Sequence, residues 1–227
     1  MPSRPAATTA SLRLAADRRS TSTPLLVFPF NGNGLEAIDC LGDAFHLVGF
    51  IDDTPAKQGT GPLSVPVLAR DALARWPDAK VLAVPGSATS YLTRRQAIAS
   101  LQVGGERFAT VIHPTARVSP LATIGRNVLI MAGAVVTSNA VIGDHVCVLP
   151  NTVIHHDVTI GDWTLIGSNV TIAGGTAIEE NCYIGSASSI MNGLRIGARS
   201  LIGLGSNVIR SCPGDSRLAG NPARSLT

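Results

Sequence analysis

Two histidines and an aspartate stand next to one another at His155, His156 and Asp157, inside a long run of branched apolar residues. An imidazole beside a carboxylate can work as an acid–base pair, because the carboxylate holds one ring nitrogen as N–H and leaves the other free to accept a proton. A single histidine at this place would more simply be a polar residue at a bend of the chain. The pair therefore predicts general-base chemistry at one of the two histidines.

A second group of residues suits phosphate rather than proton transfer. Gly32, Asn33 and Gly34 form a glycine turn before a helical pattern, where backbone N–H groups can bind an anion. Asp52 follows Gly32 at about the spacing of a dinucleotide fingerprint, with Asp53 beside it. The third glycine is missing and the block is too short for two dinucleotide-binding halves, so NAD is not favoured. A nucleotide-bearing substrate is the expected ligand, and a purely structural α/β cap is the alternative.

The histidines lie in a region with a strict period of six, residues 116–211, which divides into sixteen hexads. Each hexad carries a small or modest residue two places before a branched one, and the branched residue is often followed by glycine. Such a period is typical of a hexapeptide β-helix, in which three short strands make one triangular coil. We expect the glycines to turn the corners and the branched residues to point inward. An ordinary β-sandwich would instead show a period of two. The expected inward residues are Val118, Ile124, Ile130, Val136, Ile142, Val148, Ile154, Ile160, Ile166, Ile172, Ile178, Ile184, Ile190, Ile196, Ile202 and Val208.

The spacing of the histidines argues against a metal site. Three-histidine zinc sites in hexapeptide β-helices take their ligands from neighbouring coils, whereas His145, His155 and His156 lie within a dozen residues. We therefore expect no metal, and we expect His145 at a surface corner.

The block before the repeats alternates strands with helices, as in a small parallel α/β domain. Strands are expected over residues 25–28, 46–51, 80–84 and 108–112, and helices after the glycine turn, around residues 68–76 and over 91–101. The predicted fold class is α/β plus all-β, a small Rossmann-like domain followed by a parallel β-helix. The predicted domains are a flexible tail (1–24), a nucleotide-sugar-binding α/β domain (25–112) and a β-helix domain (113–227).

Composition restricts the possible partners. The net charge of +3 comes from the first 24 residues, so the folded body is near neutral and no nucleic-acid partner is expected. The tail lacks the apolar run of a secretion signal, and no stretch is long enough to span a membrane. The four cysteines form no close pairs, which favours reduced thiols. We expect a cytoplasmic protein that does not associate with a membrane.

Residues from about Leu25 to Arg224 resemble the sugar acyltransferases of the NeuD and PglD type, which belong to the hexapeptide-repeat acyltransferase superfamily. The resemblance rests on the hexads and four motifs: the turn 31–34, the strand end Val48–Asp53, the junction Ile112–Pro114 and the tail Ala219–Arg224. It implies a left-handed β-helix, a homotrimer, a small nucleotide-binding domain and acetyl-CoA as co-substrate.

The resemblance also implies roles for individual residues. The family's base lies in a Val-Ile-x-His-Glu stretch, which maps to His156 as the base and Asp157 as its partner, with His155 as the alternative base. A second family histidine, near the thioester, falls at Leu165, and a histidine after the glycine turn falls at Leu35. The leucine at position 165 removes an expected hydrogen bond to acetyl-CoA, and the leucine at position 35 changes an expected contact with the sugar substrate. The residues expected to bind acetyl-CoA are Leu165, Gly167, Gly174 and Ser186.

The resemblance and the residues together predict an acetyl-CoA-dependent N-acetyltransferase. It would act on the amino group of a nucleotide-linked amino sugar, for surface polysaccharide or glycan synthesis. Gly32, Asn33, Gly34, Asp52 and Asp53 would hold the nucleotide part. A sugar O-acetyltransferase of the sialic acid type is one alternative. A non-catalytic trimeric scaffold that binds nucleotide sugars is the other, and it would not need the His-Asp pair.

Overall fold

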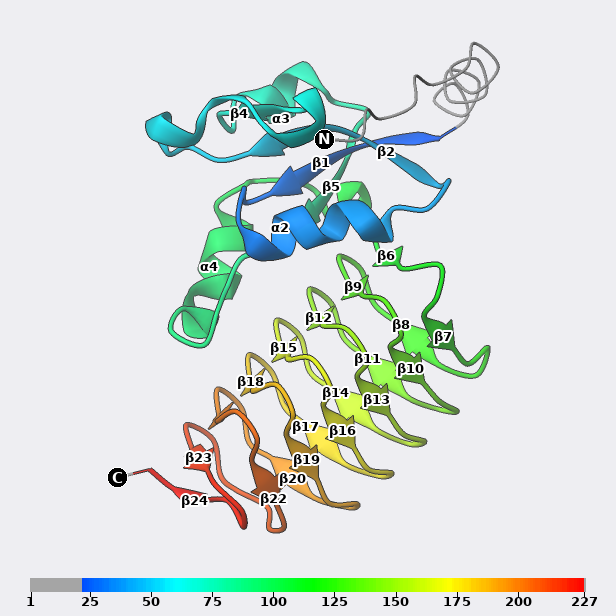
Figure 1. The fold of residues 1–227 in the computed structure, drawn as a ribbon, viewed down its shortest axis with the longest axis vertical. Helices are drawn as coiled ribbons and strands as arrows, with labels where there is room; N and C mark the ends of the chain where they lie inside the picture. Colours follow the sequence, from blue (N-terminus) through cyan, green and yellow to red (C-terminus); the bar gives the residue numbers. More distant parts are fainter. Residues whose placement is uncertain (1–21, 227) are drawn as a thin grey trace, which may run out of the picture.

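The computed structural model describes residues 22–226, so Thr227 and most of the expected tail, residues 1–21, lie outside the described part. Figure 1 shows a small α/β unit that lies along one side of a long stack of triangular coils, beside β9, β12 and β15. The predicted fold class, a small Rossmann-like α/β unit followed by a parallel β-helix, is confirmed.

The coils consist of two-residue strands, one for each hexad. A strand pairs in parallel with the strand three hexads later, as in Val135 with Val153 and Ile142 with Ile160. Each coil therefore takes three hexads, and the predicted register is confirmed. The strands are β7 (Arg117–Val118), β8 (Thr123–Ile124), β9 (Leu129–Ile130), β10 (Val135–Val136), β11 (Val141–Ile142), β12 (Cys147–Val148), β13 (Val153–Ile154), β14 (Thr159–Ile160), β15 (Leu165–Ile166), β16 (Thr171–Ile172), β17 (Ala177–Ile178), β18 (Tyr183–Ile184), β19 (Ser189–Ile190), β20 (Arg195–Ile196), β21 (Leu201–Ile202) and β22 (Asn207–Val208).

The strands form three sheets, and each sheet is named here after the strand that it contains from the first full coil, β7, β8 or β9. The β7 sheet runs β7-β10-β13-β16-β19-β22, and the β8 sheet runs β8-β11-β14-β17-β20. The β9 sheet runs from β6 (Val111–Ile112) through β9, β12, β15, β18 and β21 to β23 (Arg217–Ala219). The last strand, β24 (Arg224–Ser225), pairs with β23 in antiparallel fashion.

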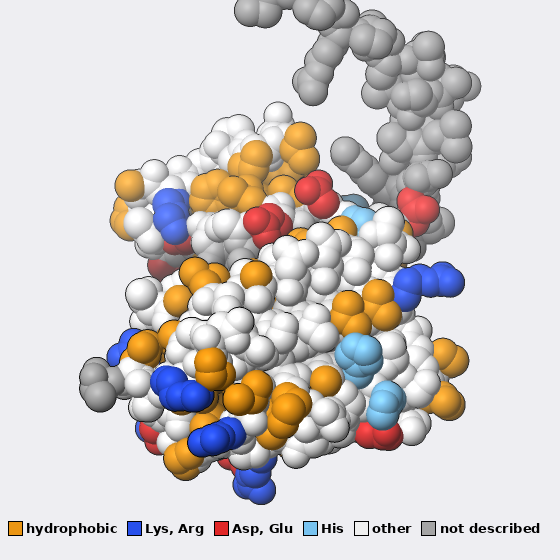
Figure 2. Space-filling view, turned by 60° about the horizontal axis from the view of Figure 1, so that its bottom comes forward, with side chains coloured by type: hydrophobic (Ala, Val, Ile, Leu, Met, Phe, Trp, Pro, Cys, Tyr) orange, Lys and Arg blue, Asp and Glu red, His pale blue; other side chains and the backbone are white. Residues whose placement is uncertain are grey.

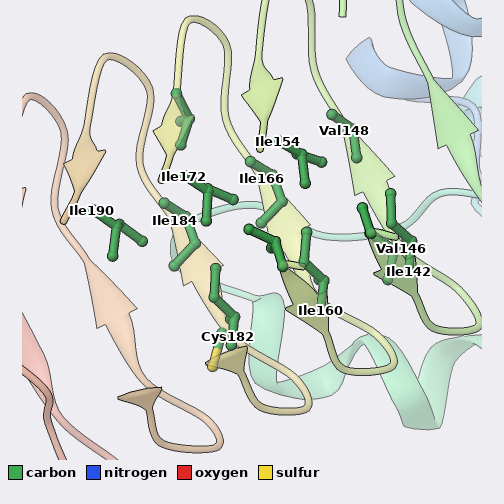
Figure 3. Packing of buried hydrophobic residues seen from close by; sticks show 14 of the residues in the cluster. Ile142, Val146, Val148, Ile154, Ile160, Ile166, Ile172, Cys182, Ile184 and Ile190 are labelled. Atoms are coloured by element: carbon green, nitrogen blue, oxygen red, sulfur yellow. The ribbon is translucent and has the colours of Figure 1, made fainter. Parts of the chain in front are cut away.

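The interior of the coils is a column of branched side chains. Ile154, Ile166 and Ile172 are completely buried, and Figure 3 shows them pointing inward with their neighbours in stacked layers. Small polar residues share this interior, and most of their hydroxyls donate to a carbonyl of the next coil, whereas Ser206 Oγ donates to the carbonyl of Gly203. Thr152 Oγ1 donates to the carbonyl of Gly167 at 2.7 Å, and Ser188 Oγ to that of Gly203 at 2.9 Å. Buried hydroxyls are tolerated when they are hydrogen-bonded in this way.

The corners are built differently from what the glycine pattern predicts. The third residue after each inward residue from Ile124 to Ile202 adopts a left-handed conformation, as at Asn139 and Asp157, both with φ 60°. The glycines directly after the inward residues have ordinary φ values. They are required because the next coil lies too close for a side chain: a Cβ at Gly161 would come 2.5 Å from the amide nitrogen of Glu180. These glycines therefore permit close stacking rather than turning the corner.

The α/β unit contains one mixed sheet with the order β3-β4-β2-β1-β5. Parallel β1 (Thr23–Phe28), β2 (Phe45–Ile51), β4 (Pro66–Leu68) and β5 (Lys80–Ala83) make up most of it, and β3 (Gly59–Thr60) is an antiparallel edge. The helices are α2 (Gly32–Glu36), α3 (Ala72–Arg75) and α4 (Arg94–Ala99), with short 3₁₀ segments at Ala37–Cys40, Pro55–Lys57, Pro62–Ser64, Tyr91–Thr93 and Gly105–Arg107.

Three sequence-based boundaries differ from this structure. β1 begins at Thr23, so Thr23 and Pro24 belong to the sheet rather than to the tail. β3 and β4 have no counterpart among the strands that the sequence predicts, and Leu68, which is predicted in a helix, ends β4. The expected strand over residues 108–112 joins the other unit: β6 pairs with β9 of the β-helix, and only Phe108 bridges to Val81 of β5.

The two units share a hydrophobic core. Leu129, Cys147 and Leu165 point outward from the β9 sheet and pack in one cluster with Leu25 and Phe50 of the α/β unit. The outer surface of the β9 sheet is thus covered within the chain, whereas the β7 and β8 sheets are not covered in this way. Among residues 22–226, no helix has the length and apolar character needed to cross a membrane.

Candidate active site

The His-Asp pair lies at the corner between the β7 and β8 sheets, directly after β13. His156 Nδ1 is 2.7 Å from Asp157 Oδ2. Because a carboxylate only accepts hydrogen bonds, this contact places the proton on Nδ1 and leaves Nε2 as the acceptor. Both side chains are exposed, His156 by 64% and Asp157 by 56%, so Nε2 is accessible to a substrate. Figure 2 shows two histidine side chains near an acidic one on a largely uncharged part of the surface.

Asp157 has a second partner that the sequence analysis did not identify. Asn139, one coil earlier at the same corner, donates from Nδ2 to Asp157 Oδ1 at 3.0 Å. The hydrogen bond from His156, and after it the one from Asn139, lowers the pKa of Asp157 below its ordinary value. Asp157 is therefore a carboxylate throughout the neutral range. A contact between residues 18 apart follows from the coil length, so the repeat itself was the signal that could have revealed Asn139.

Gly174 lies on the next coil, against the His156 ring. A Cβ at Gly174 would lie 2.6 Å from Cε1 and 2.7 Å from Nε2 of His156, well inside normal contact. A side chain there would overlap the ring. Glycine at this position therefore lets the His156 ring lie directly against the backbone of the next coil. His155, by contrast, is half-buried, and its backbone amide donates to the carbonyl of Ile172.

The other residues predicted to contact acetyl-CoA do not gather around His156 within one chain. Leu165 is 3% exposed and packs in the core shared with the α/β unit, so its side chain does not face solvent within the single chain. Gly167 and Ser186 are stacked at a different corner, between the β9 and β7 sheets, and a Cβ at Gly167 would lie 2.7 Å from Ser186 Oγ. Gly174 alone of the four adjoins His156.

The predicted nucleotide site lies at the carboxyl edge of the small sheet. The strands before it, β1 and β2, are parallel neighbours, so the glycine turn and the Asp pair meet at the same edge. The glycine turn is the first turn of α2: Asn31 caps the helix by accepting from the amide of Gly34 at 2.9 Å. The amides of Gly32 and Asn33 remain as donors at the start of the helix. Asn33 Nδ2 also donates to the carbonyl of Gly86, across the edge, at 3.5 Å.

Asp52 and Asp53 already have partners within the protein. Asp52 is 5% exposed and accepts from Lys57 Nζ at 2.7 Å and from the Thr54 amide at 3.0 Å. Burial raises its pKa, but these hydrogen bonds outweigh burial, and the net pKa lies below the ordinary value. Asp53 accepts from the backbone amide of Arg70 at 2.8 Å and pairs with the Arg70 guanidinium. Both carboxylates therefore hold the loop, and any ligand would have to share them.

His145 is not the surface residue that its corner position predicts. It is half-buried, stacks on Trp163 with ring centroids 5.9 Å apart, and its Nδ1 lies 2.9 Å from Asn127 Nδ2. Burial lowers its pKa below the ordinary value. Asn127 also bonds both the amide and the carbonyl of Ala83 on β5, at 2.7 and 2.8 Å. His145 thus belongs to the junction between the units and not to the site at His156.

Comparison with known proteins agrees with this architecture. The bacterial transferase hexapeptide family (six repeats) matches residues 121–155 and 139–174. No curated protein sequence matches significantly. The acetyltransferase domain of PglB from Neisseria gonorrhoeae FA1090, solved with acetyl coenzyme A, is 28% identical with a TM-score of 0.79, covering 90% of this chain and 100% of that one.

Two further solved structures share the fold at lower identity. PerB from Caulobacter crescentus, in complex with CoA and GDP-perosamine, is 23% identical over 91% of this chain and 98% of that one, with a TM-score of 0.78. WeeI from Acinetobacter baumannii AYE is 24% identical over 91% of this chain and 100% of that one, with a TM-score of 0.76. The chain thus carries the hexapeptide repeats and shares the architecture of solved sugar acetyltransferases, as the resemblance implied.

Proposed function

We propose that the protein is an acetyl-CoA-dependent N-acetyltransferase acting on the amino group of a nucleotide-linked amino sugar. The observation that carries the proposal is the exposed His156–Asp157 pair, in which Asp157 holds Nδ1 of His156. The solved structures that share this fold include an acetyltransferase domain in complex with acetyl coenzyme A and a protein in complex with CoA and GDP-perosamine.

The chemistry asks for a base at the attacking nitrogen. An amine attacks the thioester carbonyl with its lone pair, and the nitrogen becomes acidic as the new C–N bond forms. His156 Nε2 would accept that proton, while Asp157 holds Nδ1–H and stabilises the imidazolium. When the C–S bond breaks, the same proton can pass from Nε2 to the leaving sulfur, which departs as the free thiol of CoA. Imidazole suits this exchange because its charge changes near neutral pH.

The exposed His156 side chain is compatible with an acetyl-CoA substrate bound at this corner, and glycine at position 174 lets the ring lie directly against the next coil. When bound there, acetyl-CoA would supply the acyl group. No group of three or more His, Cys, Asp or Glu side chains suited to hold a metal occurs within residues 22–226.

The nucleotide part would lie at the carboxyl edge of the small sheet, with phosphate at the amides of Gly32 and Asn33. This edge is the usual ligand position of an open α/β sheet. His156 and Asp157, however, form their hydrogen bonds with neighbouring coils of the β-helix. Asp157 accepts from the Asn139 side chain and donates its amide to the carbonyl of Ser138, and the carbonyl of His156 accepts from the amide of Gly175. We propose that a homotrimer brings the small unit of one subunit to the corner of a neighbour, and that the enzyme works in the cytoplasm.

An acetyl-transfer assay separates the possible functions. Purified protein is incubated with acetyl-CoA and a panel of nucleotide-linked amino sugars, their hydroxy counterparts and sialic acid, and release of free CoA thiol is measured. The proposal expects release with an amino sugar only. Release with hydroxyl acceptors alone would indicate an O-acetyltransferase. Binding of nucleotide sugars without thiol release from any acceptor would indicate a scaffold.

A further inference from the structure

We infer that Asn139 is a positioning residue of this reaction, which aligns Asp157 and, through it, the His156 ring. The inference rests on the proposed function and extends it to a residue outside the His-Asp pair. Asn139 lies 18 residues before Asp157 and one coil away from it, and its side chain is directed to the same corner.

The two oxygens of Asp157 have separate partners. Oδ1 accepts from Asn139 Nδ2 at 3.0 Å, and Oδ2 lies 2.7 Å from His156 Nδ1. A carboxylate is a rigid plane, so a hydrogen bond at one oxygen fixes the direction of the other. An aspartate that is more than half exposed would otherwise rotate between rotamers and solvate both oxygens. Asn139 therefore removes the freedom that would let Asp157 leave the imidazole.

The backbone holds donor and acceptor in register. Asn139 and Asp157 occupy equivalent corner positions, each with φ 60°, and the Asp157 amide donates to the carbonyl of Ser138 at 3.0 Å. The distance between the two backbones is thus fixed by the coil stack. The short arm of Asp157 then reaches both His156 and Asn139 without a backbone change.

Asparagine at such a corner has a second, purely conformational explanation. Asparagine tolerates the left-handed region better than most residues, and Asn169 adopts it at another corner with φ 55°. The position alone would therefore indicate nothing. The hydrogen bond to a carboxylate that itself holds the candidate base distinguishes Asn139. Asn169 provides the matched control, since it is exposed and lies at a different corner.

The test compares Asn139→Gly with Asn169→Gly. Glycine accepts the left-handed backbone, so each variant removes an amide without straining the corner. We expect Asn139→Gly to lose about tenfold in kcat, the worth of one hydrogen bond to a charged group, with the KM for acetyl-CoA unchanged. Asn169→Gly should keep the wild-type kcat. Asn139→Asp should lose more than Asn139→Gly, because a second carboxylate would repel Asp157.

A double-mutant cycle then tests whether Asn139 acts through Asp157. In an Asp157→Ala background, Asn139→Gly should cause no further loss, because the group it positions is gone. An equal loss in both backgrounds, or a wild-type kcat for Asn139→Gly, would overturn the inference while leaving the acetyltransferase function intact. A wild-type protein that transfers acetyl to no acceptor of the panel would instead overturn the proposed function, and this inference with it.

Discussion

At the scale of single residues, the function depends on which histidine is the base. His156 has Nε2 open to solvent and Nδ1 bound to Asp157, whereas His155 is half-buried. We expect His156→Ala to lose about 10²–10⁴-fold in kcat, the usual contribution of a general base, with acetyl-CoA binding retained. Asp157→Asn should lose less, because the shape is kept and only the charge is removed. Steady-state kinetics with an accepted amino sugar gives these values.

His155→Ala is the control for this prediction and should stay active. If His155→Ala were inactive and His156→Ala nearly normal, the alignment of the family motif would be off by one residue. If both variants stayed active, catalysis would rest on positioning alone.

Gly174 gives a second residue-scale prediction. A Cβ at this position would lie 2.6 Å from His156 Cε1, so Gly174→Ala must displace the His156 ring from its place beside Asp157. We expect a loss of at least tenfold in kcat, since small displacements of a catalytic group are costly. In a His156→Ala background the same change should cost little further activity. Additive losses would show that Gly174 acts on the substrate independently of the ring.

The site residues differ in how far the sequence could reveal them. His156 and Asp157 are adjacent in the chain, so their pairing could be predicted. Asn139 and Gly174 reach them from the previous and next coils, and their roles depend on the direction of a side chain at a corner. The α/β unit covers the side chain of Leu165, a tertiary contact that the resemblance does not give.

At the scale of elements, α4 is tied to the β-helix by a buried cation. Arg94 is 1% exposed, and its guanidinium donates to the carbonyls of Trp163 at 3.0 Å, His145 at 2.7 Å and Pro85. Burial lowers its pKa to about 10, so it is still charged at neutral pH. Arg94→Met would leave three carbonyls without their donor.

We therefore expect Arg94→Met to lower the free energy of unfolding by roughly 2–5 kcal/mol, measured by urea denaturation. Arg95→Met is the matched control. Its guanidinium lies 4.6 Å from the Trp163 ring centroid, a contact worth about 0.5–1 kcal/mol at an exposed site. Similar losses for the two variants would contradict the assignment of Arg94 as the anchor.

The elements also show where sequence patterns suffice. The sixteen hexads share the same spacing of inward residues. An atypical residue in one hexad therefore does not obscure the pattern, and the register of every coil can be predicted from the sequence. The α/β unit has no such redundancy. The short strands β3 and β4 contain or adjoin prolines and glycines, which are typical of loops. The composition of β6 does not indicate which of the two sheets it joins. Its partner is decided by the hydrophobic contact between the units, which is a tertiary property.

At the scale of the whole molecule, the junction between the units should respond to pH. Burial lowers the pKa of His145 below its ordinary value of 6.5, so the unfolded chain binds this proton more readily than the folded one. Stability is therefore fully present above pH 6.5 and is lost as the pH falls below it. Protonation would also place an N–H of His145 against the N–H group of Asn127 Nδ2. It would add a positive charge near Arg94, whose guanidinium donates to the carbonyl of His145.

The measurement is the unfolding free energy at pH 7.5 and at pH 5.5. His145→Phe keeps a ring against Trp163 but cannot titrate, so its loss between the two pH values should be smaller than that of the wild type. Because the other histidines are present in both proteins, the difference isolates His145. An identical pH dependence would show that His145 is not the group responsible.

The assembly is the last prediction, and the outer surfaces of the coils support it. The β9 sheet is covered by the α/β unit of the same chain, but the outward residues of the other two sheets are mostly uncharged. On the β7 sheet they are Arg117, Val135, Val153, Thr171, Ser189 and Asn207, and on the β8 sheet Thr123, Val141, Thr159, Ala177 and Arg195. Val141 is 44% exposed and Met191 45%. Apolar surface of this kind favours association.

A closed ring needs two different faces on each chain, and the β7 and β8 sheets provide them on either side of the His156 corner. We expect light scattering at micromolar concentration to give three times the mass of one chain. Val141→Glu, which changes a residue already exposed in the single chain, should weaken the assembly and lower activity in parallel, whereas Asn169→Gly should leave the mass unchanged. A stable, fully active monomer would contradict both the trimer and the proposal that a neighbouring subunit completes the site.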